Sequence, residues 1–121
     1  MTPAEMIATL DLSLEQYGED VTLRRSTWVE GVATHIDAGV RAKVSGYLSD
    51  ELVGGIVQGD RKVILSPTGL AAWPAIDATS DERVPAVGDV VISAGRAYRV
   101  MAPNPLRAGG EMVRIELQVR G

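Results

Sequence analysis

Apolar residues at the start of the chain recur at the spacing of an α-helix. The stripe consists of Met6, Ile7, Leu10, Leu14 and Tyr17. Thr2 and Glu5 form the T-x-x-E pattern of a capping box, and Pro3 stands at the first helical position, which favours proline. Gly18 follows at the position of a C-cap. The pattern predicts a helix from Pro3 to Tyr17.

Beyond the helix, the period of the pattern changes to two, which is typical of β-strands. The last run alternates most regularly, with Val113, Ile115 and Leu117 on one face. Turn signals at Gly59-Asp60 and Ala94-Gly95 separate neighbouring runs. The strand-like runs are Val21–Thr27, Asp37–Leu48, Glu51–Gly59, Arg61–Ser66, Asp89–Ser93, Arg96–Val100 and Glu111–Gly121.

One helix followed by about six or seven strands argues against a parallel α/β sheet. A small antiparallel barrel or sandwich is the natural arrangement, and barrel closure has the advantage of hiding the sheet edges. The chain has 121 residues, the size of one domain. We therefore predict a mainly β fold in a single domain, residues 1–121. Its parts are an N-terminal helix in 1–18 and a small antiparallel β-barrel in 19–121, with a long loop at 66–88.

The long loop, Ser66–Gly88, has no sustained period and contains prolines, glycines and acidic residues. A loop of this length in a compact domain is usually functional or disordered. Its candidate interface or gate residues are Leu70, Trp73, Ile76, Asp77, Asp81 and Glu82. Trp73 has two interpretations: it plugs one end of the barrel, or it anchors an interface, where tryptophan is enriched. A second loop, Ala102–Glu111, is predicted between the last two strands.

Composition and charge narrow the classes of function. The chain contains no cysteine, which excludes disulfides, thiol catalysis and cysteine-ligated metals. Its net charge of −4 argues against a dedicated DNA-binding surface, which is normally basic. No run of about 18 apolar residues is present, and the first residues lack the basic start of a signal peptide. We therefore expect no membrane span and no signal peptide.

The sequence offers weak candidates for catalysis and phosphate binding. His35 is the only histidine, and in a strand it would share a face with Asp37, which could make an acid–base dyad. A solvated histidine beside a turn aspartate is the favoured alternative, because no nucleophile motif accompanies the pair. Gly88 and Gly95 fit neither the P-loop nor the dinucleotide-binding pattern, so we interpret them as turn residues. From these residues we expect no metal site.

Two basic pairs, Arg24-Arg25 and Arg61-Lys62, are candidate polar contacts between subunits. Neighbouring residues of a strand point to opposite faces, so neither pair would act as a single fork. A solvated polar face is the simpler interpretation of both pairs.

Four stretches, in order along nearly the whole chain, resemble the small head-completion proteins of long-tailed double-stranded DNA phages. They are LEQYGEDVTLRR (Leu14–Arg25), VQGDRKVILSP (Val57–Pro67), PAVGDVVISAGRAYRV (Pro85–Val100) and IELQVRG (Ile115–Gly121). The third stretch contains the P-x-x-G-D and G-x-x-Y-x-V patterns. These proteins are also called stoppers, head-closure proteins or head–tail connector proteins, and the same type occurs in prophages and gene transfer agents.

The resemblance implies a β-barrel subunit that assembles into a homo-oligomeric ring, usually a dodecamer, in the neck of the virion. It also implies that the protein has no enzymatic activity and no cofactor. The ring lies below the portal and adaptor proteins and above the tail terminator or tail tube proteins. Its loops close the channel, retain packaged double-stranded DNA without reading its sequence, and offer a docking surface to the tail. Before assembly the subunit would reside in the host cytoplasm. Acidic residues in the channel would repel DNA phosphates, and Asp50 and Glu51 are candidates beside the acidic loop residues.

Three alternatives stay open. One is another neck ring such as the tail terminator. Another is a monomeric small-barrel binding module of the SH3 or oligonucleotide-binding type, which would need an aromatic stacking face. Tyr17, Tyr47 and Tyr98 are too dispersed in the sequence to indicate such a face. The third is a small enzyme that uses His35 and Asp37.

Overall fold

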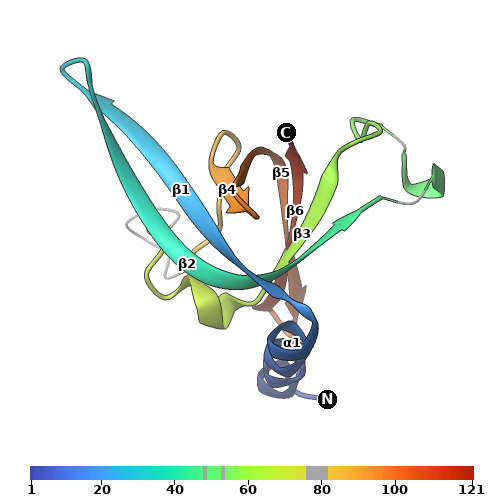
Figure 1. Ribbon diagram of the computed structural model, residues 1–121. Coiled ribbons are helices and arrows are strands. Elements are labelled where there is room, and N and C mark those ends of the chain that lie inside the picture. The colour runs from blue at the N-terminus through green and yellow to red at the C-terminus, as the bar shows by residue number, and fades with distance from the viewer. Residues whose placement is uncertain (48, 53, 76–81) are drawn as a thin grey trace.

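Six antiparallel strands form a closed barrel in the computed structural model of the chain, and one helix packs against it (Figure 1). The structure describes residues 1–47, 49–52, 54–75 and 82–121. The strands follow one another around the barrel in the order β1-β2-β3-β6-β5-β4. The elements are α1 (Pro3–Tyr17), β1 (Glu19–Val29), β2 (Val32–Gly46), the 3₁₀ helix η1 (Ser49–Glu51), β3 (Arg61–Leu65), the 3₁₀ helix η2 (Pro67–Leu70), β4 (Val90–Ser93), β5 (Arg96–Ala108) and β6 (Glu111–Arg120). The predicted mainly β fold is confirmed.

Helix α1 begins and ends where the sequence predicts. The Thr2 hydroxyl accepts a hydrogen bond from the Glu5 N–H at 3.2 Å, and the Glu5 carboxylate accepts one from the Thr2 N–H at 3.1 Å, which completes the capping box. Gly18 ends the helix with a φ of −88°, so it is not needed for a left-handed turn. It is needed for space, because a Cβ there would lie 2.5 Å from the Leu14 carbonyl oxygen and 2.8 Å from that of Ala42.

The apolar stripe of the helix faces the barrel, with Met6, Ile7 and Leu10 half-buried and Leu14 the most deeply buried. Leu14 is buried, whereas Tyr17 is exposed, so the predicted stripe is wrong at its last position. Arg41 on β2 donates hydrogen bonds to the carbonyl oxygens of Leu14 at 3.0 Å and Glu15 at 3.2 Å. The Leu14 carbonyl also accepts the Gly18 N–H at 2.9 Å, whereas the Glu15 carbonyl is one that the last helical turn leaves free.

The barrel interior consists of aliphatic side chains and one tryptophan, as a chain poor in aromatic residues requires. The alternation of β6 is preserved, since Ile115, Leu117 and Val119 are fully buried and their neighbours are not. The core cluster comprises Val21, Leu23, Ala38, Val40, Ala42, Val63, Leu65, Leu70, Trp73, Val84, Val91, Val100, Met112, Ile115, Leu117 and Val119.

Two predicted elements are wrong. The run Glu51–Gly59 was expected to be a strand, but its described residues form the end of η1 and then turns. Gly54 and Gly59 have φ values of 61° and 96°, which a strand cannot accommodate. The expected loop Ala102–Glu111 is instead mostly the second half of β5, and only a two-residue turn separates β5 from β6.

The prolines of β5 explain the second error. Pro103 and Pro105 lie opposite Leu117 and Ile115 of β6. Strand β4 pairs with β5 only as far as Arg99, so the other edge of β5 carries no ladder beyond that point. Proline lacks the N–H that a ladder needs, and a strand edge without a partner tolerates it.

Strands β1 and β2 are longer than predicted and form one continuous hairpin. The tight turn consists of Glu30 and Gly31, with φ values of 52° and 80°. A turn with two positive φ values matches the twist of the flanking strands. The tip of this hairpin extends away from the barrel (Figure 1).

Candidate functional site

The long segment from Ser66 to Gly88 begins by packing into the barrel. Helix η2 starts after Ser66, whose hydroxyl accepts a hydrogen bond from the Thr68 N–H at 3.3 Å. Leu70 is buried and Trp73 is 0% exposed, and both belong to the core cluster. Of the two interpretations of Trp73, the structure therefore favours the plug over the interface anchor.

The other candidate residues of this segment are only partly described. Ile76, Asp77 and Asp81 lie outside the described residues. The Glu82 carboxylate forms an ion pair with Arg107 on β5. Hydrogen bonding to that guanidinium holds the pKa of Glu82 below its usual value. The segment thus rejoins the barrel at Glu82, and its role as a gate stays a prediction.

Arg25 covers the buried tryptophan. It shares its face of β1 with the buried residues Val21 and Leu23. Its guanidinium carbon lies 5.0 Å from the centroid of the Trp73 ring, within the range of a cation–π contact. The same group donates two hydrogen bonds, of 3.0 and 2.8 Å, to the carboxylate of the buried Asp89. Bidentate geometry of this kind fixes both partners.

The P-x-x-G-D stretch, Pro85 to Asp89, forms a turn that Asp89 holds. The Asp89 carboxylate accepts a hydrogen bond from the Ala86 N–H at 2.7 Å, and the Asp89 N–H donates to the Ala86 carbonyl at 3.0 Å. Gly88 has a φ of 96°, which favours glycine. The Val100 N–H donates to the Asp89 carbonyl at 2.8 Å and joins the turn to β5. The glycine therefore shapes the scaffold, as predicted.

Asp60 forms a buried polar centre between the turn before β3 and the end of β6. Its side chain is 1% exposed. The carboxylate accepts hydrogen bonds from the Val57 N–H at 3.1 Å, from Gln118 Nε2 at 2.9 Å and from Arg120 Nε at 2.8 Å. Hydrogen bonding to Arg120, above all, holds the pKa of Asp60 far below its usual value. The sequence indicated a turn at Asp60 but not this network.

The four basic residues predicted to contact other subunits are mostly paired within the chain. Arg24 bonds to Asp37 across the hairpin, at 2.8 and 2.9 Å, on the face opposite Arg25. Lys62 bonds to Glu51 at 3.0 Å, while Arg61 forms no ion pair with a described residue. Neighbouring residues thus point apart, as predicted, and contacts of these residues with other subunits stay a prediction.

His35 and Asp37 share a face of β2 but engage different partners. The Ser26 hydroxyl lies 2.8 Å from His35 Nδ1, in the register that pairs these two residues. Both oxygens of Asp37 bond to Arg24, and this bonding lowers the pKa of Asp37. The pair therefore does not have the hydrogen bond of an acid–base dyad. Among the described residues, no group of three or more His, Cys, Asp or Glu side chains is placed to hold a metal ion.

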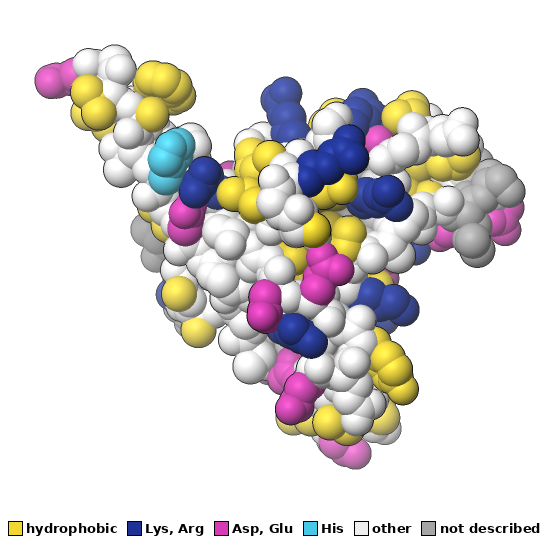
Figure 2. Space-filling model, viewed as in Figure 1, with side chains coloured by type: hydrophobic (Ala, Val, Ile, Leu, Met, Phe, Trp, Pro, Cys, Tyr) yellow, Lys and Arg dark blue, Asp and Glu magenta, His cyan; other side chains and the backbone are white. Residues whose placement is uncertain are grey.

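A shallow groove of roughly 460 Å³ with basic residues at its margin lies where β4, β5 and the end of β6 meet. We call it the basic groove and define it by Val90, Ala97, Tyr98, Arg99, Met101 and Arg120. Beside it, the Arg96 guanidinium carbon lies 5.5 Å from the centroid of the Tyr98 ring. Dark blue side chains gather at the top of the view in Figure 2, over these elements. Sequence reasoning missed this groove because three separate strands contribute to it.

The tip of the β1–β2 hairpin exposes large apolar side chains. Trp28 is 73% exposed, Val29 62% and Val32 65%. Strand β1 pairs with β4 only up to Arg24, and β2 pairs with β3 only from Ala42 onward. Residues 26–37, which we call the arm, therefore pair only within the β1–β2 hairpin, and Figure 2 shows apolar side chains at their tip.

Comparison with protein-family models and with curated proteins finds no match. None of the described helices is long and apolar enough to cross a membrane.

Proposed function

We propose that this chain is a structural subunit of a phage neck, a ring between the portal and adaptor proteins and the tail. The observation that carries the proposal is the arm, which extends from a closed barrel and exposes three large apolar side chains near its tip. A surface of this kind marks contact with another protein. It supplements the ordered set of motifs that resemble head-completion proteins.

In this proposal, the barrel is the rigid body of a dodecameric ring, and the parts that project from it meet other proteins. The arm extends on one side and the segment between β2 and β3 on the other (Figure 1). The subunit acts without catalysis or a cofactor, retains double-stranded DNA without reading its sequence, and presents a face to the tail. The segment Ser66–Gly88, anchored through Trp73 and Glu82, remains the proposed gate.

Deletion of the gene from the phage or prophage that encodes the chain tests the proposal. Particles made without the protein should have DNA-filled or leaking heads and no tails in negative-stain images. Supply of the wild-type gene from a plasmid should restore tails, and purified tailed particles should contain the chain. Normally tailed particles from the deletion strain would overturn the proposal.

One observation favours a second candidate, a monomeric small-barrel module that binds nucleic acid. Tyr98 and Arg99 line the basic groove, and Arg96 lies against the Tyr98 ring beside it. Base stacking plus basic side chains is how such modules bind single strands. Fluorescence anisotropy with labelled single-stranded oligonucleotides separates the candidates. Tight binding that weakens steeply between 50 and 200 mM salt, by an order of magnitude or more, would favour the module. The neck proposal expects weak binding at both concentrations.

A further inference from the structure

The arm is a two-stranded ribbon without support from the rest of the described chain. A two-stranded hairpin on its own is marginally stable in water. This one also exposes Trp28, Val29 and Val32, and transfer of these apolar side chains out of water lowers the free energy. Both properties indicate that another surface covers the arm in the assembled state.

Apolar side chains lie on both faces of the arm. Val29 and Val32 are cross-strand partners and share a face with Ile36, in continuation of the face that points into the barrel. Trp28 lies on the opposite face, opposite Ala33. Whichever face of the tip meets a partner, apolar side chains therefore lie in the contact.

The basic groove complements the arm tip in chemistry and in charge. Its apolar lining includes Ala97 and Met101, and Arg99 lies at its margin. Arg96 and Arg99 form no ion pair with a described residue, and neither does Glu30 at the arm tip. The carboxylate of Glu30, which stands between apolar side chains on the arm, thus matches the guanidinium of Arg99 beside an apolar lining.

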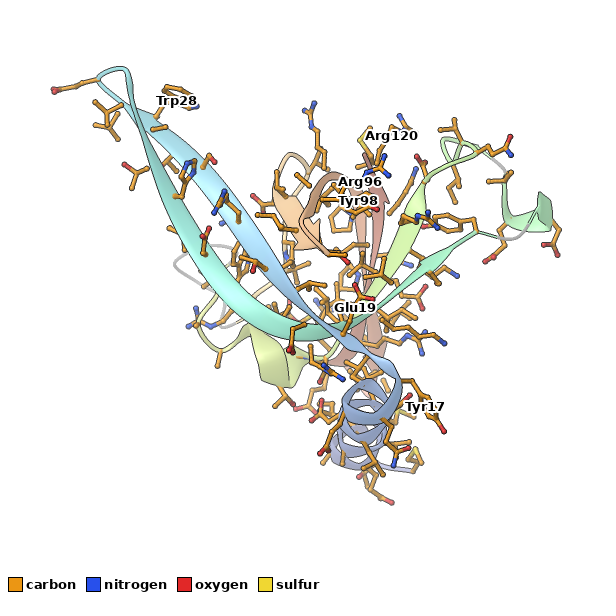
Figure 3. All side chains as sticks on the ribbon, viewed as in Figure 1. Tyr17, Glu19, Trp28, Arg96, Tyr98 and Arg120 are labelled. Atoms are coloured by element: carbon orange, nitrogen blue, oxygen red, sulfur yellow. The ribbon has the colours of Figure 1, made fainter. Side chains whose placement is uncertain are left out.

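One chain cannot place its arm in its own groove. Figure 3 shows Trp28 at the projecting tip of the hairpin, at the upper left, and Arg96, Tyr98 and Arg120 well apart from it over the body of the barrel. The two surfaces can meet only between copies, and such contact is heterologous, because different patches of the two copies are joined. Contacts of this type form rings when the rotation closes.

We propose that the arm of one copy docks in the basic groove of the next copy. Trp28 and Val29 pack against the apolar lining, and Glu30 pairs with Arg99. The inference goes beyond the neck proposal, since it assigns the surfaces that meet and holds for a head-to-tail ring of any function.

Crosslinking of the full chain tests the inference directly, because the chain has no native cysteine. Val29→Cys marks the arm, and Ala97→Cys marks the groove. We expect a mixture of the two single variants, treated with a short bis-maleimide, to give a crosslinked dimer, while Val29→Cys alone gives none. A chain that carries both substitutions should give a ladder of higher oligomers.

Matched variants show which contacts matter. Trp28→Ser in the Val29→Cys chain should raise the protein concentration needed for the mixed crosslink by about 30-fold, which is the effect of losing an interface hot spot. Tyr17→Ser, which removes an equally exposed aromatic side chain from the helix, should leave it unchanged. Glu30→Arg should weaken the mixed crosslink, and Arg99→Glu on the groove copy should restore it.

Several outcomes would overturn the inference. They are no mixed dimer at any protein concentration, a dimer from Val29→Cys alone, or equal crosslinking of Val29→Cys to Thr9→Cys on the helix. Binding of oligonucleotide to the groove without any crosslink between copies would assign the groove to nucleic acid instead. Tail assembly by a Trp28→Ser, Glu30→Arg chain would leave the neck proposal intact and remove only the arm contact.

Discussion

Substitution of Asp60 by asparagine removes one charge from a buried network and keeps the shape of the side chain. Asparagine can still accept from the Val57 N–H, but its amide cannot accept two hydrogen bonds from Arg120. Hydrogen bonds to charged groups contribute about 1.5–3 kcal/mol each. Arg120 is 38% exposed and can regain water, so we expect a loss near the lower end, about 2 kcal/mol. That loss corresponds to a fall in Tm of about 8 °C for a chain of this size.

The pH dependence makes this prediction specific. Asp60 has a lowered pKa in the folded chain, so its stabilisation is complete above the unfolded pKa of about 4 and is lost as the pH falls below it. Urea unfolding followed by circular dichroism should show a constant difference in the free energy of unfolding between wild type and Asp60→Asn from pH 5 to 8. At pH 3 this difference should be about 1 kcal/mol smaller.

Asp20→Asn is the control for this experiment. Asp20 also pairs with an arginine, Arg41, at 3.3 Å, but its side chain is 91% exposed. Exposed pairs contribute little, so Asp20→Asn should leave the unfolding midpoint unchanged. Equal losses in the two variants, or a difference for Asp60→Asn that stays constant down to pH 3, would refute the argument.

Further predictions concern the plug, the helix end and the helix cap. Trp73→Ala should lower the free energy of unfolding by about 3–5 kcal/mol because it leaves a cavity in the core, whereas Trp28→Ala should leave Tm unchanged in a thermal melt. Gly18→Ala should destabilise by about 1–3 kcal/mol through its clash with two carbonyl oxygens, and Gly39→Ala, which meets no atom within 4 Å, should not. Thr2→Ala should cost about 1 kcal/mol in urea unfolding, and Thr2→Ser should retain most of the stability.

The fold was predictable where the local pattern and the tertiary environment agree. The cap residues of α1 and the alternation of β6 both act within a few residues, so the sequence alone determined them. The prolines of β5 made residues 102–111 resemble a loop. A strand accepts them there because β4 ends before them and leaves that edge of β5 unpaired, which is a property of the closed barrel. The run 51–59 is rich in β-forming residues, but its glycines have positive φ values.

The functional surfaces were predictable only in part. Trp73 was identified as a plug or an anchor, and only its burial decided between these roles. The exposure of Trp28 and Val29 depends on how far β4 and β3 extend along the hairpin, which no local pattern encodes. Arg99 and Arg120 belong to different strands, and their proximity follows from the β5–β6 register.

We expect the barrel to open first between β1 and the short strand β4. Only three residue pairs, from Thr22–Ile92 to Arg24–Val90, join β1 to β4, and this is the shortest ladder of the barrel. The Arg25–Asp89 pair continues this junction by one position, so its two hydrogen bonds reinforce the seam between β1 and β4. In native-state hydrogen exchange, the amides of Thr22 and Ile92 should therefore exchange before those of β6. Arg25→Met should raise the exchange rates of the amides between β1 and β4 and leave those of β6 unchanged.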